Sequence, residues 1–389
     1  MTRADGGETA RSDRGSPGRQ IQAFQLFFAG ATLYAALAVP LWVLQYVGSA
    51  APWPERAASW HGHEMVFGYA LAVVAGYLIT RGSLVTVLGT LCTWLAARVV
   101  VMGPPLPALV EAGVALAFPA VLFALAGLPF LRAAKSWRNA VFGLLLAGFL
   151  GAEALYQLGT LDLLQAGQER GTILALDLVV LLLFTMGGRV IAAATSGAIR
   201  RTGAHLKGAA QHRLERAGVA VLGAMSLLDA LLWAAPVAAI LDLAAALVVL
   251  LRLLRWRAGR VVDVPEVSTL HLGYAWLAVG LLLKAAAQGL GVMNLSESMH
   301  GLMVGGLGTL SLVMMARVAL QRLRRPIEFP PPVLAAVGLV STAAVVRSLA
   351  ILPELRLAMV EAAAIAWTAA FFVFALFLGR LFLTGRETR

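Results

Sequence analysis

Long apolar runs, separated by short stretches rich in Arg, Gly and Pro, follow one another from residue 21 to near the C-terminus. About 20 apolar residues are enough to cross a bilayer as a helix, in which every backbone polar group is paired internally. The pattern therefore predicts an all-α fold, a polytopic bundle of about twelve transmembrane helices: Ile21–Gly48, His61–Thr80, Leu84–Met102, Ala108–Leu131, Arg138–Gly159, Gly171–Ser196, Ala217–Trp233, Ala234–Leu254, Ser268–Leu290, Glu297–Leu320, Pro330–Ala350 and Leu355–Leu378.

The division between the seventh and eighth helices rests only on the turn from Trp233 to Pro236, and merging such neighbours leaves ten or eleven as the alternative count. Residues 1–20 combine arginines with Gly, Ser, Thr and Asp and contain no apolar core, so we interpret them as a disordered cytoplasmic tail and not as a signal peptide. Residues 21–380 then form one helical domain, followed by a cytoplasmic tail at 381–389.

Composition supports a membrane protein, because 60% of the 389 residues are hydrophobic and only 13% are charged. Soluble domains contain roughly 25% charged residues. The net charge of +11 does not indicate a nucleic-acid partner, since the basic residues are spread along the chain instead of forming one patch. Cys92 is the single cysteine, which excludes an internal disulfide, a CxxC zinc site and covalent c-type haem attachment. Any metal must rely mainly on histidine.

The basic residues predict the orientation of the bundle. With the N-terminus in the cytoplasm, only Arg56, Arg170 and Arg356 fall in loops on the outer side. The positive-inside rule therefore predicts that both termini lie in the cytoplasm. The corresponding basic residues of the inner loops and helix ends are Arg81, Arg132, Lys135, Arg138, Arg200, Arg201, Lys207, Arg213, Arg216, Arg252, Arg255, Arg257, Arg260, Arg317, Arg322, Arg324 and Arg325.

This topology assigns a depth to each intramembrane histidine. His61 and His63 open the second helix at the outer face, and His300 lies at a similar depth in the tenth, so these residues could meet. His271 begins the ninth helix at the inner face, on the order of 25 Å from His300 along straight helices. Arg189 lies near the inner face too. We therefore expect two polar centres, an outer one and an inner one.

The spacing of the outer histidines restricts how they act together. Residues two apart lie roughly 200° from each other around a helix, so either His61 belongs to the entry loop or His61 and His63 face different partners. His61, Glu64 and Met65 are expected to share a face, as are His300, Met303 and Val304. Gly301, Gly305 and Gly308 form a small-residue surface, suited to close helix approach or to a flat ring such as porphyrin.

Each polar residue also has a purely structural interpretation. A single intramembrane histidine commonly packs through a hydrogen bond, which is the interpretation we favour for His271, and Met65 and Met303 are expected to fill the core. We expect Lys284 and Arg347 to pair with carboxylates in the same half of the bundle, namely Glu111, Glu153, Asp177, Asp229, Asp242 or Glu361.

Four segments resemble successive signatures of the NnrS family, namely WHGHEMVFGYALAVVAGYLIT, LLLFTMGGRVIAAAT, HLGYAWLAVGLLL and SMHGLMVGGLGTLSLVMMARVAL. The resemblance implies a bacterial inner-membrane protein linked to haem and copper and to protection from nitric oxide during denitrification and nitrosative stress. It further implies metal-binding roles for His61, His63, His271 and His300, with Arg189 as a partner for a propionate or another anion.

Two segments depart from the family pattern. Arg81-Gly82-Ser83 replaces a proline-asparagine-tryptophan-threonine-glycine segment, and Ala319-Leu320-Gln321-Arg322 replaces a glycine-histidine-threonine-glycine-arginine run. The missing histidine would lie close to His271. We therefore expect the inner centre to be incomplete and place the metal at His61, His63 and His300.

The resulting hypothesis is haem-linked or copper-linked handling of nitric oxide in a bacterial inner membrane. Three neutral imidazoles suit haem b or copper, and nitric oxide is apolar enough to arrive through lipid. Whether the protein is an enzyme stays open. The alternatives are a transporter of a small solute or metal ion, and an assembly or sensory component whose histidines only pack.

Overall fold

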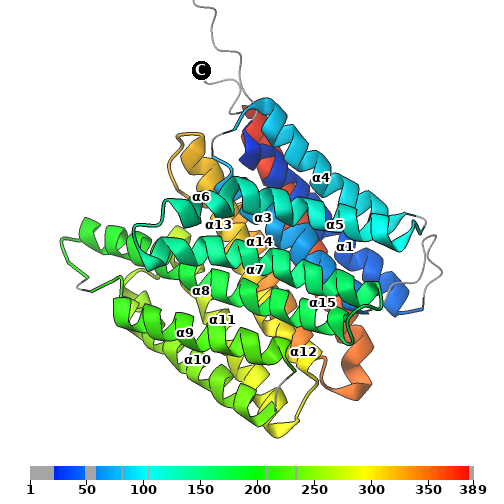
Figure 1. The fold of residues 1–389 in the computed structure, drawn as a ribbon. Coiled ribbons are helices and arrows are strands. Elements are labelled where there is room, and N and C mark those ends of the chain that lie inside the picture. The colour runs from blue at the N-terminus through cyan, green and yellow to red at the C-terminus, as the bar shows by residue number, and fades with distance from the viewer. Residues whose placement is uncertain are drawn as a thin grey trace, which may run out of the picture.

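The computed structural model describes residues 22–48, 58–80, 82–103, 105–206, 208–232 and 235–384, and these residues form an all-helical bundle (Figure 1). The expected N-terminal tail lies outside the described residues, as do residues 385–389. The helices are α1 (Ala23–Tyr46), α2 (Ala58–His63), η1 (Glu64–Ala70), α3 (Leu71–Leu78), α4 (Leu84–Met102), α5 (Ala108–Leu122), η2 (Phe123–Gly127), α6 (Leu128–Arg132), α7 (Trp137–Thr160), α8 (Gly167–Arg201), α9 (His212–Ala230), α10 (Ala235–Trp256), η3 (Ala258–Arg260), α11 (Pro265–Leu290), α12 (Leu295–His300), η4 (Gly301–Gly308), α13 (Thr309–Arg322), α14 (Pro331–Leu349), η5 (Pro353–Leu355) and α15 (Arg356–Thr384).

Ten helical segments of the described chain are long and apolar enough to cross a membrane, which confirms the polytopic helical bundle. The remaining two predicted helices are present as well, as α9 and as the continuous segment α2–η1–α3, although both carry more polar residues near one end. Every predicted helix therefore has a counterpart, and α9 and α10 are separate helices. The orientation across a bilayer stays a prediction.

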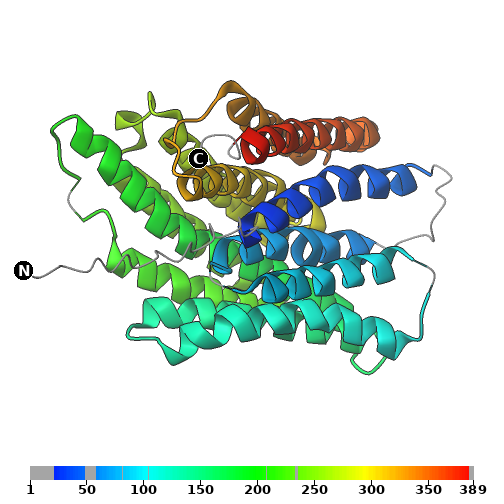
Figure 2. The same ribbon diagram turned by 90° about the horizontal axis from the view of Figure 1, so that it is seen from above.

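The helices run side by side, so that successive connections alternate between two ends of the bundle (Figures 1 and 2). In Figure 1, α9 and α10 lie along one edge and α4 along the other. The segment α12–η4–α13 is the most completely buried of the membrane-length segments, and α8 is the next. We call the end of the bundle at which α2 and α12 begin the α2/α12 end, which the predicted topology places at the outer face.

Two π-helical segments follow the histidines of the α2/α12 end directly. η1 begins at Glu64, immediately after His63, and η4 begins at Gly301, immediately after His300. A π-helical turn contains more residues than an α-helical one, so it rotates the side chains that follow relative to those that precede it. Such turns occur frequently at functional sites.

The glycines of η4 allow close helix packing. A Cβ atom on Gly305 would lie 2.4 Å from the Trp276 ring of α11, and one on Gly308 would lie 2.8 Å from the Trp367 ring of α15. Indole rings of neighbouring helices therefore already occupy this surface. Of the two uses expected for these glycines, the structure supports helix approach and leaves no room against them for a porphyrin.

Candidate metal centre

A cavity of about 850 Å³ opens at the α2/α12 end, between α1, α2–η1, α7, α8, α11, α12–η4, α14 and α15. Most of its wall is apolar, with Val39, Val304, Leu307 and Trp367 among its residues. His61, His300 and Arg347 are among the polar residues that line it. An apolar cavity of this size with a few convergent polar groups is typical of a ligand site.

The structure brings His61 and His300 together across this cavity, from two segments far apart in the sequence. Their ring centroids lie 6.4 Å apart, and the two ring planes are inclined by only 12°. A metal ion held between two imidazoles needs each ligating nitrogen about 2 Å from the ion, and therefore two nitrogens about 4 Å apart. Because the nitrogens lie at the edges of the rings, the observed centroid separation is compatible with one ion shared by the pair.

Both imidazoles keep a nitrogen for a ligand. Nδ1 of His300 lies 2.8 Å from the Ser296 carbonyl oxygen and donates to it, so that Nε2 carries the lone pair of the neutral ring. A carbonyl that fixes the tautomer in this way is the usual support of a metal-binding histidine. Nδ1 of His61 is buried and has no hydrogen-bond partner among the described residues, and the ring is held by stacking on Trp42 at 4.6 Å.

Arg347 lines the cavity, although the sequence pattern predicted that it would form an ion pair. Its neighbour Arg356 pairs with Glu297 at 2.9 Å, whereas Arg347 forms no close ion pair or hydrogen bond among the described residues and interacts with Glu297 only at longer range. The expected pairing is therefore absent for Arg347. An arginine inside an apolar helix, at the same end as His61 and His300, is the signal that could have identified it as a cavity residue.

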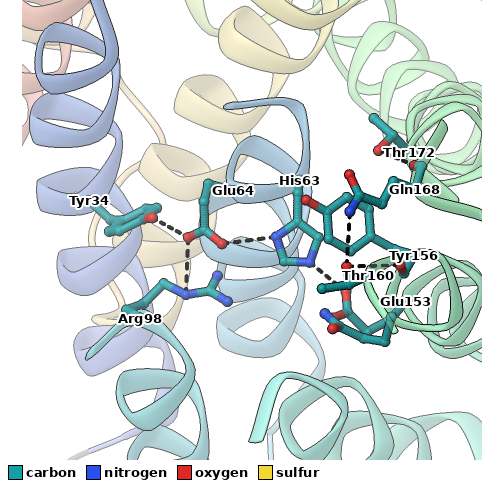
Figure 3. Close-up of polar contacts among 10 residues, drawn as sticks. Tyr34, His63, Glu64, Arg98, Glu153, Tyr156, Thr160, Gln168 and Thr172 are labelled. Carbon is teal, nitrogen blue, oxygen red and sulfur yellow. Dashed lines mark hydrogen bonds and ion pairs between the residues drawn. The ribbon is translucent and has the colours of Figure 1, made fainter. Parts of the chain in front are cut away.

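His63 lies in a separate buried network (Figure 3). Its Nδ1 lies 2.9 Å from Glu64 Oε1, and its Nε2 lies 2.8 Å from Glu153 Oε2 of α7. Glu64 also accepts a hydrogen bond from the Tyr34 hydroxyl and lies 3.2 Å from Arg98 Nε. A side chain on α1, one on α4 and one on α7 thus converge on the start of α2–η1, and both ring nitrogens of His63 are occupied.

The network is balanced in charge when His63 is an imidazolium. Both His63 nitrogens face carboxylate oxygens, and only the doubly protonated ring donates from both. His63 and Arg98 then offset Glu64 and Glu153, all four of which are buried. Buried charges are tolerated when they are paired in this way. Of the two arrangements open for His61 and His63, the structure has the second, in which they face different partners.

His271 and Arg189, which the sequence predicts near the inner face, lie well away from the cavity. His271 and Lys284 are both on α11, and the 13 residues between them correspond to about 20 Å of helix. His271 Nε2 lies 2.9 Å from the Thr195 hydroxyl, and the ring is buried against Trp256. Arg189 donates to the Arg138 carbonyl and lies over the Phe142 ring at 4.4 Å. Among the described residues, no group of three or more His, Cys, Asp or Glu side chains is arranged to hold a metal ion, at this end or elsewhere.

Arg322, at the end of the segment that departs from the family motif, links two helices. Its guanidinium donates to the carbonyl oxygens of Gly76 at 3.0 Å and Tyr77 at 2.7 Å, at the end of α3. Carbonyls in the last turn of a helix have no intrahelical partner, and a cation is a favourable one. Arg322 therefore ties α13 to α3.

Fold and cavity define a polytopic helical membrane protein with a paired-histidine cavity near one end of the bundle. Within that class, the chain belongs to the NnrS family, whose description is NnrS protein and which matches residues 21–386, nearly the whole chain. No curated protein and no solved structure matches the chain.

Proposed function

We propose that this protein binds haem b or copper between His61 and His300 and acts in the handling of nitric oxide or in resistance to nitrosative stress in a bacterial inner membrane. The observation that carries the proposal is the near-parallel pair of imidazoles at 6.4 Å, each with a nitrogen left for a ligand, in a largely apolar cavity. Membership of the NnrS family supports the same function.

The cavity suits either group. His61 and His300 would hold a haem iron, and Arg347 would supply a cation for the haem carboxylates. The thioethers of Met65, Met299 and Met303 also line the cavity, and a soft sulfur ligand favours copper(I). When bound, the iron or copper ion would supply a redox-active centre for the chemistry of nitric oxide.

Each side chain of the cavity has a separable task in this proposal. Ser296 fixes the His300 tautomer through the 2.8 Å hydrogen bond, and Trp42 holds the His61 ring in place by stacking. The apolar residues Val304 and Leu307 keep the site dry, which strengthens every electrostatic interaction inside it. His63 acts outside the cavity, by anchoring α2–η1 to α7, and the proposal assigns it no ligand role.

The test is an optical spectrum of the protein purified from cells grown with ample iron and copper. We expect Soret and visible haem bands, or stoichiometric copper without them, and a spectral shift when nitric oxide is added anaerobically. A protein that contains neither haem nor copper, and that does not acquire either on reconstitution, contradicts the proposal.

A transporter of a small solute or metal ion is the second candidate function. It is favoured by Lys284, which is fully buried among three aspartates near the cavity wall, because intramembrane charges commonly mark substrate or ion paths. Uptake of candidate solutes into vesicles that contain the metal-free protein distinguishes transport from the metal-binding function. Transport without metal would favour the second candidate.

A further inference from the structure

Four helices bring a buried cluster of ionisable groups together beside the cavity. Lys284 of α11 lies 2.9 Å from Asp177 of α8, 2.5 Å from Asp229 of α9 and 3.4 Å from Asp242 of α10. This confirms the expected pairing of Lys284 with carboxylates in the same half of the bundle. Lys284, Asp177 and Asp242 are fully buried, and Asp229 is nearly so. The number of carboxylates exceeds what one ammonium requires.

The charges do not balance if every group is ionised. Three carboxylates and one ammonium carry a formal charge of −2, and Gln288, the other polar side chain in contact with Asp229, is neutral. In the charge-balanced network around His63, by contrast, two cations meet two carboxylates. An uncompensated negative charge in a low-dielectric interior is strongly unfavourable, and such groups take up protons instead.

The unpaired oxygens indicate where a proton resides. Asp229 is the best satisfied of the three, because it contacts both Lys284 and Gln288. Asp177 Oδ2 and Asp242 Oδ2 are buried without a hydrogen-bond partner in the described chain, and Asp242 Oδ1 has only the longer ion pair with Lys284, at 3.4 Å. Asp177 and Asp242 are thus the members of the cluster that gain most from protonation.

We propose that Asp177, Asp242 and Lys284 form a proton-storage site that exchanges protons with the cavity. Lys284 lies at the cavity wall and is the member of the cluster that meets it. In a transfer, Nζ passes one proton to an acceptor in the cavity and receives another from the carboxylic acid of Asp177 or Asp242, so that Lys284 stays an ammonium. The storage site does not depend on a bound metal.

Infrared spectroscopy of the full-length protein in detergent tests the proposal. In a mildly alkaline buffer, exposed carboxyls are ionised, so a carboxylic-acid C=O band reports a buried protonated group. We expect such a band in the wild-type protein, with a shift in D₂O buffer because the site exchanges with the cavity. Asp177→Asn or Asp242→Asn should remove the band or most of its intensity.

The exposed Asp263 of the turn before α11 provides the matched control, and Asp263→Asn should leave the band unchanged. The proposal is overturned if the wild-type protein has no carboxylic-acid band, or if both Asn variants fold and retain it in full. A band that fails to shift in D₂O contradicts exchange with the cavity. The wild-type measurements decide the matter even if a variant does not fold, and they apply equally to metal-free protein, so their outcome is separate from that of the metal proposal.

Discussion

At the scale of single residues, two histidines separated by one glycine have unlike surroundings. His61 stacks on Trp42 and retains an unbonded Nδ1, whereas His63 lies between two carboxylates with both nitrogens occupied. An imidazole becomes a ligand only when a lone pair is free to face the ion. The same residue type therefore supports a binding role at one position and a structural role at the other.

Removing His63 should destabilise the fold without emptying the cavity. In His63→Ala, Glu64 and Glu153 lose a shared buried cation, and breaking a buried pair in this way costs about 3–5 kcal/mol. We expect a clearly lower midpoint of thermal unfolding in detergent, with the metal content of the protein that remains folded unchanged. The double variant His63→Gln with Glu153→Gln should recover part of the loss, because it removes one buried charge of each sign. Metal loss at unchanged stability would instead make His63 a ligand.

Arg347 should contribute to binding of an anionic group in the cavity. Arg347→Gln removes the cation, and a hydrogen bond to a charged group contributes about 2 kcal/mol, or roughly thirtyfold in affinity. We expect haem retention during purification to fall in this variant and to recover partly in Arg347→Lys. Arg356→Gln is the control, because Arg356 is already paired with Glu297. Equal retention in wild type and Arg347→Gln would exclude this role.

At the scale of elements, helix extents could be predicted from the sequence better than local helix geometry. The observed α4, Leu84–Met102, has the predicted limits, because the polar segment ending at Ser83 precedes it and the Gly- and Pro-rich segment 103–107 follows it. α8 was predicted as Gly171–Ser196 but spans Gly167–Arg201, since charged residues continue a helix beyond the hydrocarbon where hydropathy no longer reports it. The π-helical segments could not be predicted, because no residue periodicity marks them.

The η1 segment shows how local helix geometry that could not be predicted changes which residues line the cavity. Glu64 was expected to share a face with His61 and Met65, yet only the latter two line the cavity, and Glu64 joins the His63 network. His300 and Met303 do line the cavity as predicted, together with Val304. The partners His63 and Glu153 are separated by 90 residues. A contact of that kind follows from helix packing and has no local signal in the sequence.

The glycines of η4 provide a test at this scale. In Gly305→Ala, the new methyl group would lie 2.4 Å from the Trp276 ring, and overpacking of this kind costs about 1–3 kcal/mol. We expect a lower unfolding midpoint for this variant. Gly338→Ala on α14 is the matched control, because its Cβ would meet nothing within 4 Å and alanine favours a helix. Similar stability of both variants would show that α11 and η4 are not packed as closely as described.

At the scale of the whole molecule, up-and-down topology places His61, His300, Arg347 and the Lys284 cluster at the same end of the bundle. The order of the helices along the chain predicted that these residues lie at the opposite end of the bundle from His271 and Arg189, and the structure separates them in this way. The direction in which each side chain points could not be predicted from the order of the helices. The identity of the residues facing the cavity depends on how helical segments far apart in the sequence pack around it.

Orientation can be tested directly. Because the basic residues gather in alternate loops, a reporter that fluoresces only in the cytoplasm should be bright when fused after Arg389 or inserted near Gly203, between α8 and α9. It should be dark when inserted near Gln165, between α7 and α8. The reverse pattern would place the cavity at the cytoplasmic face and would contradict the predicted orientation.

The most direct test of the central claim is the haem and copper content per chain of His61→Ala and His300→Ala, measured beside His271→Ala. If His61 and His300 hold one ion between them, each of the first two variants loses most of the bound metal while remaining folded in the membrane. His271→Ala, which removes an imidazole bonded to Thr195 far from the cavity, keeps the wild-type content. Comparable losses in all three variants, or full metal content in both cavity variants, would contradict the assignment of the metal to this pair.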